Sequence, residues 1–401
     1  MHPISELIAL ALYAPVIVWV HELGHAAFAR RGGYRVTSIG IGFGRPLWRT
    51  RLRGGVVLHV DKWLMAGGAC VAVPARPPTY LRAWFHGGGL IAQVALALVL
   101  ALLPSWWWVD RVATFNLLVL ASNALPWRIG GNASDGWYLL DLLRGGAHST
   151  SILSQRTALE RLAAREAAID SPLGKVYADV CLAWVDLLSG QLAEAGYTLG
   201  RDPAETAVVP WIDALYHYVR AEWHRKEGRP DEALAMLEHT RAAVDGGVYD
   251  ESLAMLDVAE ARALLDLGAP DRALRVLARI SGVEGAIGRQ AAAVQLVAVL
   301  DAPVAELEYA TWRVVRRAGE GLLDPGDVVQ ALWSAGDRLH AAKRLAAADG
   351  AHRAARRLAG ATLRAADPDV RARLALQLGP ALAPPQRRAL TLGETTPPGS
   401  R

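Results

Sequence analysis

Two histidines and a glutamate near the N-terminus are the sharpest chemical feature of the sequence. They form the run His21-Glu22-Leu23-Gly24-His25. Residues four apart share one face of a helix, so both imidazoles can reach a single metal ion. The glutamate after the first histidine is placed to take a proton from an attacking water. The motif therefore predicts a zinc site with His21 and His25 as ligands and Glu22 as the catalytic base.

The alternative for this motif is a set of polar side chains that reach from a helix end toward a membrane surface. It explains the residues less well, because three ionisable groups beside an apolar span are costly without a role.

A catalytic zinc also needs a third protein ligand and an open position. The next acid after Glu22 is Asp61, which falls in a region of strand-like runs. Asp135 is the better candidate, because it lies just past an apolar run and precedes Gly136. Asp141, on a short amphipathic piece, is the second choice.

The element that must carry the two histidines is a long apolar run at residues 4–28. About 20 apolar residues suffice to cross the hydrocarbon core of a bilayer. The run lacks a basic segment before it and an evident cleavage site, which favours a retained span over a signal peptide. Further spans are predicted at residues 84–103 and 112–129, separated by a tryptophan-rich interfacial belt. A buried helix of a soluble protein is the alternative for the first run, and its length argues against that.

Residues 34–73 have a different character, with many glycines and short strand-like runs. The runs 46–53 and 56–60 are joined by Gly54-Gly55, which predicts a β-hairpin. We expect His59 to face water, since it alternates with apolar neighbours. The edge near residues 47–60 could hold an extended substrate by strand addition.

Basic residues gather in the same part of the chain. Between residues 30 and 82 there are ten Lys and Arg against the single acid Asp61. Next to apolar spans this predicts a cytoplasmic segment. Three crossings then place the N-terminus outside and the C-terminal region in the cytoplasm.

Composition excludes several other classes. The 401 residues are 52% hydrophobic and 20% charged, and these averages combine an apolar N-terminal third with a charged remainder. A net charge of +4 gives no indication of nucleic-acid binding. Two distant cysteines, Cys70 and Cys181, provide neither a disulfide framework nor a cysteine metal motif.

From about residue 150 the pattern changes to amphipathic helices. Three similar segments start at Gly190, Gly228 and Gly268, and a weaker copy starts at Gly336. In the strong copies a glycine ends one helix, and Pro-Asp opens the next in two of them. The pattern resembles tetratricopeptide repeats, with a longer period. It predicts a helical repeat domain over residues 150–378, followed by a disordered tail at 379–401.

The N-terminal motifs together resemble the site-2 protease family of intramembrane zinc metalloproteases. The resemblance covers roughly residues 4–145 and rests on the histidine motif, a Gly-rich second span, and Asn123-Ala-Leu-Pro126 ahead of Asp135-Gly136. It implies that His21, His25 and Asp135 bind Zn²⁺ and that Glu22 is the catalytic base. The connection from Pro126 to Asp135 is longer than in the family, with eight residues between them.

The resemblance also implies two substrate-binding amides. Asn123 and Gln93 could donate hydrogen bonds to a substrate carbonyl or its oxyanion. Gln93 stands where the family has asparagine, and interhelical packing is an equal alternative for it.

The sequence thus predicts a mainly α protein. Residues 1–147 form a polytopic membrane core with a small β-hairpin insertion, and a soluble helical repeat (solenoid) domain follows. The predicted function is intramembrane zinc-dependent proteolysis of a membrane protein substrate, in the lipid bilayer of the cell membrane. The repeats would bind substrate or a partner protein, with a spacer or self-association role equally open. The alternatives are an inactive membrane adaptor that acts through its repeats, and a soluble zinc protease.

Overall fold

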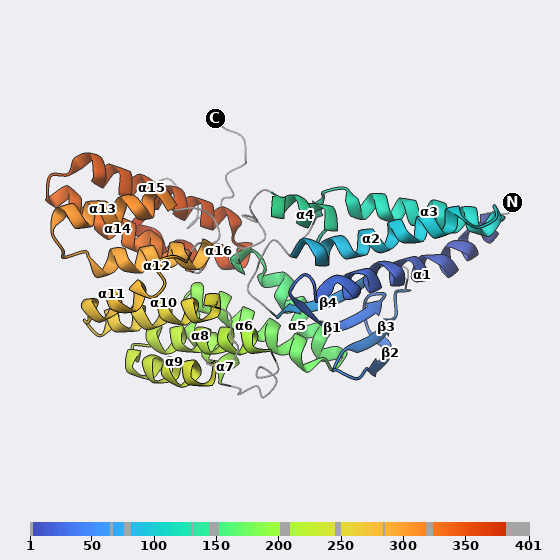
Figure 1. Cartoon of the computed structure of the whole chain (residues 1–401), viewed down its shortest axis with the longest axis horizontal. Helices are drawn as coiled ribbons and strands as arrows, with labels where there is room; N and C mark the ends of the chain where they lie inside the picture. Colours follow the sequence, from blue (N-terminus) through green and yellow to red (C-terminus); the bar gives the residue numbers. More distant parts are fainter. Residues whose placement is uncertain are drawn as a thin grey trace. The chain divides into compact units, whose positions relative to one another are not determined.

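The computed structural model describes residues 3–64, 67–75, 82–129, 132–143, 152–200, 209–244, 250–283, 285–317 and 324–381. The chain divides into two compact units, and helices dominate both (Figure 1). The first unit contains the described parts of residues 1–149, 157–179 and 203–212, and the second contains those of 150–156, 180–202 and 213–401. This division differs from the predicted boundary near residue 150, because helix α5 (Arg156–Ala168) and the start of α6 (Pro172–Leu188) pack largely with the N-terminal unit.

The first unit contains four further helices. They are α1 (Pro3–Ala29), α2 (Arg82–Ala101), α3 (Trp107–Ala124) and α4 (Asp135–Leu143). Helix α2 packs against α1, α3 and α4; α1, α2 and α3 lie side by side in Figure 1, and α4 lies at the end of α3. Among the described residues one helix, Arg82–Ala101, is long and apolar enough to cross a membrane.

The helix that overlaps the third predicted span begins and ends earlier in the sequence than predicted. It begins at Trp107, inside the predicted tryptophan belt, and ends at Ala124. Its end has a local cause: the residue before a proline avoids the helical region, and Leu125 before Pro126 is extended, with ψ of 132°. Residues 125–129 therefore lie outside the helix, contrary to the predicted range 112–129.

The glycine-rich region forms a four-stranded sheet. Its strands are β1 (Tyr34–Ile41), β2 (Pro46–Arg51), β3 (Val57–Asp61) and β4 (Gly68–Pro74), in the order β2-β3-β1-β4. The predicted hairpin is confirmed, since β2 and β3 pair antiparallel through Gly54 and Gly55, both at positive φ. Strand β1 pairs parallel with β3 and antiparallel with β4. Consequently β3 is interior, and the sheet edges are β2 and β4.

The second unit is built from successive helices that pack on one another. After α6 these are α7 (Leu192–Leu199), α8 (Pro210–Lys226), α9 (Pro230–Val244), α10 (Asp250–Asp266), α11 (Pro270–Ala278), α12 (Gly285–Ala298), α13 (Val304–Arg317), α14 (Pro325–Ala341), α15 (Leu345–Ala365) and α16 (Pro368–Gln377). The described part of this unit also contains two short 3-10 turns, η2 (Ile152–Ser154) and η4 (Gly379–Ala381). Residues 382–401 of the predicted tail lie outside the described residues.

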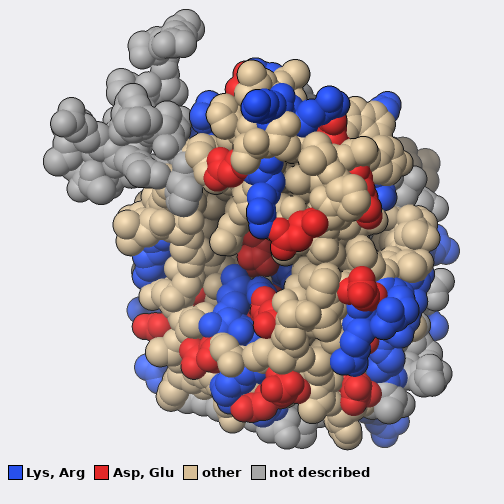
Figure 2. All heavy atoms as spheres, turned by 90° about the vertical axis from the view of Figure 1, so that its left-hand side faces the viewer, with Lys and Arg blue, Asp and Glu red and all other residues tan. Residues whose placement is uncertain are grey.

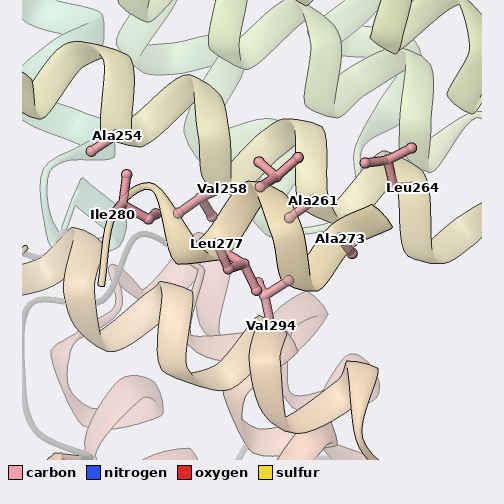
Figure 3. Close-up of a cluster of buried hydrophobic side chains, with 9 residues drawn as sticks. Ala254, Val258, Ala261, Leu264, Ala273, Leu277, Ile280 and Val294 are labelled. Atoms are coloured by element: carbon pink, nitrogen blue, oxygen red, sulfur yellow. The ribbon is translucent and has the colours of Figure 1, made fainter. Parts of the chain in front are cut away.

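The predicted helix ends lie where the glycines indicate. Gly190, Gly228 and Gly268 have φ of 79°, 77° and 70°, which suits a residue without a side chain. The weaker fourth copy is wrong: Gly336 lies inside α14, and the turn after that helix contains Lys343 at φ 60°. Between α10, α11 and α12 the apolar faces meet in a buried cluster that includes Val258, Leu277 and Val294 (Figure 3).

Candidate metal centre

Three side chains from two helices converge at one point in the first unit. His21 and His25 lie one turn apart on α1, and Asp135 is the first residue of α4. The Oδ2 atom of Asp135 lies 3.1 Å from His21 Nε2 and 3.4 Å from His25 Nε2, and the two Nε2 atoms are 3.0 Å apart. All three residues are buried or nearly so. The structure thus brings together the three predicted metal ligands.

The outer nitrogens of both imidazoles are fixed by helix α2. His21 Nδ1 bonds Gln93 Oε1 at 3.0 Å, and His25 Nδ1 bonds the carbonyl oxygen of Phe85 at 2.7 Å. Both partners are acceptors, so each Nδ1 carries the proton. Each Nε2 then presents a lone pair to the centre, which is the arrangement that metal-binding histidines adopt.

These donor atoms fit a metal ion. With both Nδ1 atoms protonated, two imidazole lone pairs and a carboxylate oxygen face one another, and Asp135 Oδ2 is buried without a hydrogen-bond donor. Three acceptors at such distances repel unless a cation lies between them. Ligands of a tetrahedral zinc held at about 2.0–2.2 Å lie roughly 3.3–3.6 Å apart, close to the separations found here.

Glycines allow α1 and α2 to approach closely at this point. A Cβ on Gly24 would lie 2.4 Å from the carbonyl oxygen of Gly88, and one on Gly89 would lie 2.5 Å from His21 Cε1. Any side chain at Gly89 would also meet His25 Nε2 at 2.7 Å. The glycine inside the histidine motif and those opening α2 therefore set the spacing that brings Gln93 and Phe85 to the imidazoles.

The long connection before Asp135 folds back on itself. Strand β5 (Arg128–Ile129) pairs antiparallel with β6 (Asn132–Ala133), which absorbs the extra length. Ser134 closes the loop, since its Oγ donates to Leu125 O at 2.5 Å and accepts from Trp137 N at 3.1 Å. A Cβ on Gly136 would lie 1.9 Å from Ala124 O, so only glycine lets α4 start against the end of α3. The eight-residue connection thus still delivers Asp135 to the histidines.

Asp135 carries a negative charge at neutral pH. Burial alone would raise its pKa, but the adjacent imidazoles of His21 and His25 outweigh burial and lower the pKa to about 2. A carboxylate in this form is the species that binds a metal.

Glu22 lies between the imidazoles and the sheet. It is 7% exposed, and the backbone N–H of Cys70 on β4 donates to its carboxylate. A Cβ on Gly68 would meet Glu22 Cγ at 2.9 Å, so this edge strand packs directly on α1. The predicted base is therefore held beside both the metal cluster and the edge strand β4.

The other predicted residues occupy different surroundings. Asp141, the second choice for third ligand, is buried on α4 and is not part of the described metal cluster. Gln93 is fully buried and orients His21, while its Nε2 has no partner among the described residues. Asn123 is half-buried in the last turn of α3, and no hydrogen bond among the described residues links it to the cluster.

Comparison with known proteins decides the family. A model described as peptidase family M50 matches residues 8–315, which is more than half of the chain. The chain belongs to peptidase family M50. Its members are generally membrane-bound zinc metallopeptidases, and the His21, His25 and Asp135 cluster suits that chemistry. The motifs suggested a resemblance limited to the N-terminal third. The family match instead extends into α13. No curated protein matches the chain.

This M50 chain also has a polar network that the motifs did not indicate. Glu166 of α5 is fully buried and accepts from Ser38 Oγ at 2.9 Å and from Thr37 Oγ1 at 3.2 Å, both on β1. Thr37 Oγ1 also contacts Val71 O on β4 at 3.3 Å, one residue from the N–H that bonds Glu22. Nothing in the sequence marks Glu166, because it lies on an ordinary amphipathic helix.

A second buried group lies on the same face of the sheet and is also next to α5. His59 is wholly buried, contrary to the expectation that it faces water. Its Nδ1 donates to Asp61 Oδ1 at 3.0 Å, and Arg165 Nη2 lies 3.4 Å from its Nε2. The parallel pairing of β3 with β1 places it in the sheet interior, where Gly40 makes room for the ring.

Proposed function

We propose that the chain is a zinc-dependent endopeptidase that cleaves a peptide bond in or near a membrane span of a protein substrate. The convergence of His21, His25 and Asp135, with Glu22 beside them, is the observation that carries the proposal. When bound, zinc polarises the scissile carbonyl and makes water acidic enough to react near neutral pH. Gln93 and Phe85 O hold the two imidazoles in the binding tautomer.

Glu22 is the residue that moves the proton. Its carboxylate accepts a proton from the attacking water and returns it to the leaving amine. The N–H of Cys70 holds one side of the carboxylate. Gln93 Nε2, buried without a partner in the described part of the chain, supports the predicted donor to the substrate, and Asn123 remains a second candidate for that role.

The membrane setting rests on exposed apolar surface. Helices α2 and α3 expose large side chains that would be unfavourable in water, among them Leu98, Val99, Leu117 and Leu118. With α1, these helices form a multi-pass core in the cell membrane. The exposed arginines of the β-sheet region then mark the cytoplasmic side, where the helices of the second unit also lie.

An extended substrate binds to the β4 edge in this proposal. The predicted edge near residues 47–60 includes β3, which is an interior strand and has no open side for a substrate. Strand β4 is the edge next to Glu22, and Cys70 N–H points outward from it. Backbone groups alternate along a strand, so Ala72 has its N–H on the same free edge. A locally unwound substrate can pair there with its scissile bond at the metal.

Glu22→Gln tests the reaction. The variant keeps the shape of the side chain and removes its basicity, so zinc content should be unchanged while cleavage falls about 10²–10⁴-fold. The measurements are zinc per chain by atomic emission and cleavage of a panel of single-span membrane proteins. Intact protein that binds no zinc would end the proposal, and zinc binding without any cleavage would favour the adaptor alternative.

A proline pair tests the edge. Ala72→Pro removes an outward N–H of β4 and should lower cleavage without changing zinc content. Leu47→Pro is the matched control, because Leu47 lies on the other edge strand at a break in its register. Equal loss of cleavage in both variants, or in neither, contradicts pairing at β4.

A further inference from the structure

Glu166 of α5 is a fully buried acid that is held by hydroxyl groups. Its Oε1 accepts from Ser38 Oγ at 2.9 Å, and its Oε2 accepts from Thr37 Oγ1 at 3.2 Å. A side chain on Gly174 of α6 would overlap the carboxyl, so this helix also closes over it. These surroundings differ from the face of the molecule in Figure 2, where acidic and basic side chains are interspersed and opposite charges lie close together.

The two hydroxyls come from consecutive residues of β1. In a regular strand, neighbouring side chains point to opposite faces of the sheet. The ladder between β1 and β4 is interrupted here, since Val36 pairs with Ala72 and Ser38 pairs with Val71. Thr37 is therefore the extra residue of a β-bulge, which bends the strand and re-aims its side chains. The bulge explains how Thr37 and Ser38 reach the same carboxyl.

The bulge lies next to the contact between β4 and the predicted base. Thr37 Oγ1 has a second acceptor within reach, Val71 O at 3.3 Å. The neighbouring residue Cys70 pairs with Ile39 and donates its N–H to the carboxylate of Glu22. Without the extra residue, the two halves of the β1–β4 ladder would be one residue out of step. A one-residue slip of the half that contains Cys70 would turn its N–H away from Glu22.

We propose that Glu166 is a positioning residue for peptide-bond cleavage. Its carboxyl fixes the bulge at Thr37, and the bulge keeps β4 in the register that aims Cys70 N–H at Glu22. An apolar side chain would fill the space between the sheet and α5 at a lower cost, because a buried carboxyl is unfavourable unless it is hydrogen-bonded. Bulges next to active sites serve to re-aim groups in this way. The inference rests on the proposed endopeptidase function, but the placement of Cys70 N–H is measurable without cleavage.

Amide exchange tests that placement. The chain has two cysteines, so labelling the full-length protein with ¹⁵N-cysteine gives two amide signals, from Cys70 and Cys181. Glu166→Leu removes both acceptors and should speed exchange of the Cys70 amide about five- to tenfold, as for the loss of one hydrogen bond. The buried Cys181 should keep its protection and shows that the variant is folded. An unchanged Cys70 amide overturns the proposal.

Two further variants control this measurement. Glu160→Leu makes the same substitution on the exposed side of α5 and should leave both cysteine amides unchanged. Thr37→Val keeps the branched shape of the side chain and removes the hydroxyl. It should speed exchange of the Cys70 amide as Glu166→Leu does, and it decides the question if Glu166→Leu unfolds. Faster exchange in Glu160→Leu as well would mean that Cys70 reports general loosening of α5, which overturns the proposal.

Kinetics test the role in cleavage. Thr37→Val should lower kcat, expressed per zinc-loaded chain, about tenfold while KM changes less than about threefold, because the base is displaced and the metal is not. Thr37→Ser keeps the hydroxyl and should keep the parental kcat. Because both residues act through one contact, Thr37→Val combined with Glu166→Leu should lose no more than the stronger single variant. Additive losses, or equal kcat in the Val and Ser variants, overturn the proposal.

The two measurements separate this inference from the proposed function. A parental chain that cleaves no substrate contradicts the endopeptidase proposal, while exchange of the Cys70 amide still tests whether Glu166 places that N–H. Loss of zinc from folded Glu166→Leu would show that the network supports the metal ligands instead of the base, and it would overturn the inference.

Discussion

Two buried polar clusters of this M50 peptidase are built on opposite principles. In the metal centre, His21, His25 and Asp135 direct three acceptor atoms at one another. The N–H group of each imidazole points away from the centre and bonds to helix α2. In the second unit, acids and bases alternate, so Arg262 is enclosed by carboxylates. The first cluster is completed only by an added cation, whereas the second is largely complete in itself.

The difference separates a site from a structural network. Buried charges that pair internally stabilise a fold only when the geometry is good, and removing one partner leaves an uncompensated charge. A cluster of unopposed acceptors costs stability until its ligand arrives. Variants in the two clusters should therefore give opposite pairs of results: loss of metal with little change in stability, or loss of stability with no change in metal.

His25→Ala should give the largest effect. It removes one of the three ligands, so zinc binding should fall from stoichiometric to background and cleavage should disappear with it. The apo protein should unfold no more easily than the parent, because the variant relieves the repulsion among acceptors. Zinc titration by calorimetry and thermal unfolding in chelator measure the two quantities. Retention of stoichiometric zinc would show that the cluster is not the metal site.

Arg262→Met should give the reciprocal result. Glu222, Asp324 and Asp327 would lose their shared cation, and the cost should be about 3–5 kcal/mol of unfolding free energy. Hydrogen exchange of α10 amides measures the loss, while zinc content stays at the parental value. Arg338→Met is the control, since its pair with Asp301 is exposed and should contribute about 0–1 kcal/mol. Similar losses in both variants would remove the distinction between a buried network and a surface pair.

Two neighbouring glycines of α2 sharpen the comparison within the metal centre. Gly89→Ala should lower zinc affinity and cost about 1–3 kcal/mol, because the new methyl group overlaps both imidazoles. Gly87→Ala is the matched control: nothing lies within 4 Å of its added Cβ. It should raise stability by about 0.5–1 kcal/mol, as alanine favours a helix more than glycine does. Equal zinc affinities in the two variants would mean that the helix contact at Gly89 does not set the ligand geometry.

The sequence revealed what depends on local spacing. His21, Glu22 and His25 lie on one helix, so their meeting follows from the helical repeat, and the turns at Gly190, Gly228 and Gly268 follow from backbone preference. The Asp-Gly pair made Asp135 a candidate ligand, but the sequence did not show that it lies next to the histidines. The β5–β6 pairing that precedes Asp135 is too short to give a strand pattern.

Contacts between distant segments were not readable in this way. The bond from Ser38 to Glu166 joins residues 128 apart, and only the folded chain shows that this helical glutamate is buried. The parallel pairing of β1 with β3 is equally non-local, and it turned His59 from an expected surface residue into a buried one. Periodicity gives the alternation of faces along a strand but not which face another element covers.

The smallest predicted effect concerns His59. This residue belongs to a third kind of buried polar group, whose contacts are all favourable only while the imidazole is neutral. Its Nδ1–H donates to Asp61, and its Nε2 lone pair faces Arg165. Burial lowers the pKa of His59 below its usual 6.5, and the charge of Arg165 adds to the decrease against the opposing effect of Asp61. The unfolded chain therefore binds a proton near pH 6.5 that the folded chain does not.

The sign of the pH dependence follows from that proton. Stability contributed by neutral His59 is present above pH 6.5 and decreases as the pH falls below it, by at most about 1.4 kcal/mol per pH unit. His59→Gln keeps an amide that can donate to Asp61 and does not titrate, so the loss of stability between pH 7 and pH 5 should be smaller than in the parent. The difference is measured by urea unfolding at the two pH values, with hydrogen exchange of the β3 amides as the readout. If parent and variant lose equal stability over this range, the acid sensitivity of the first unit arises from groups other than His59.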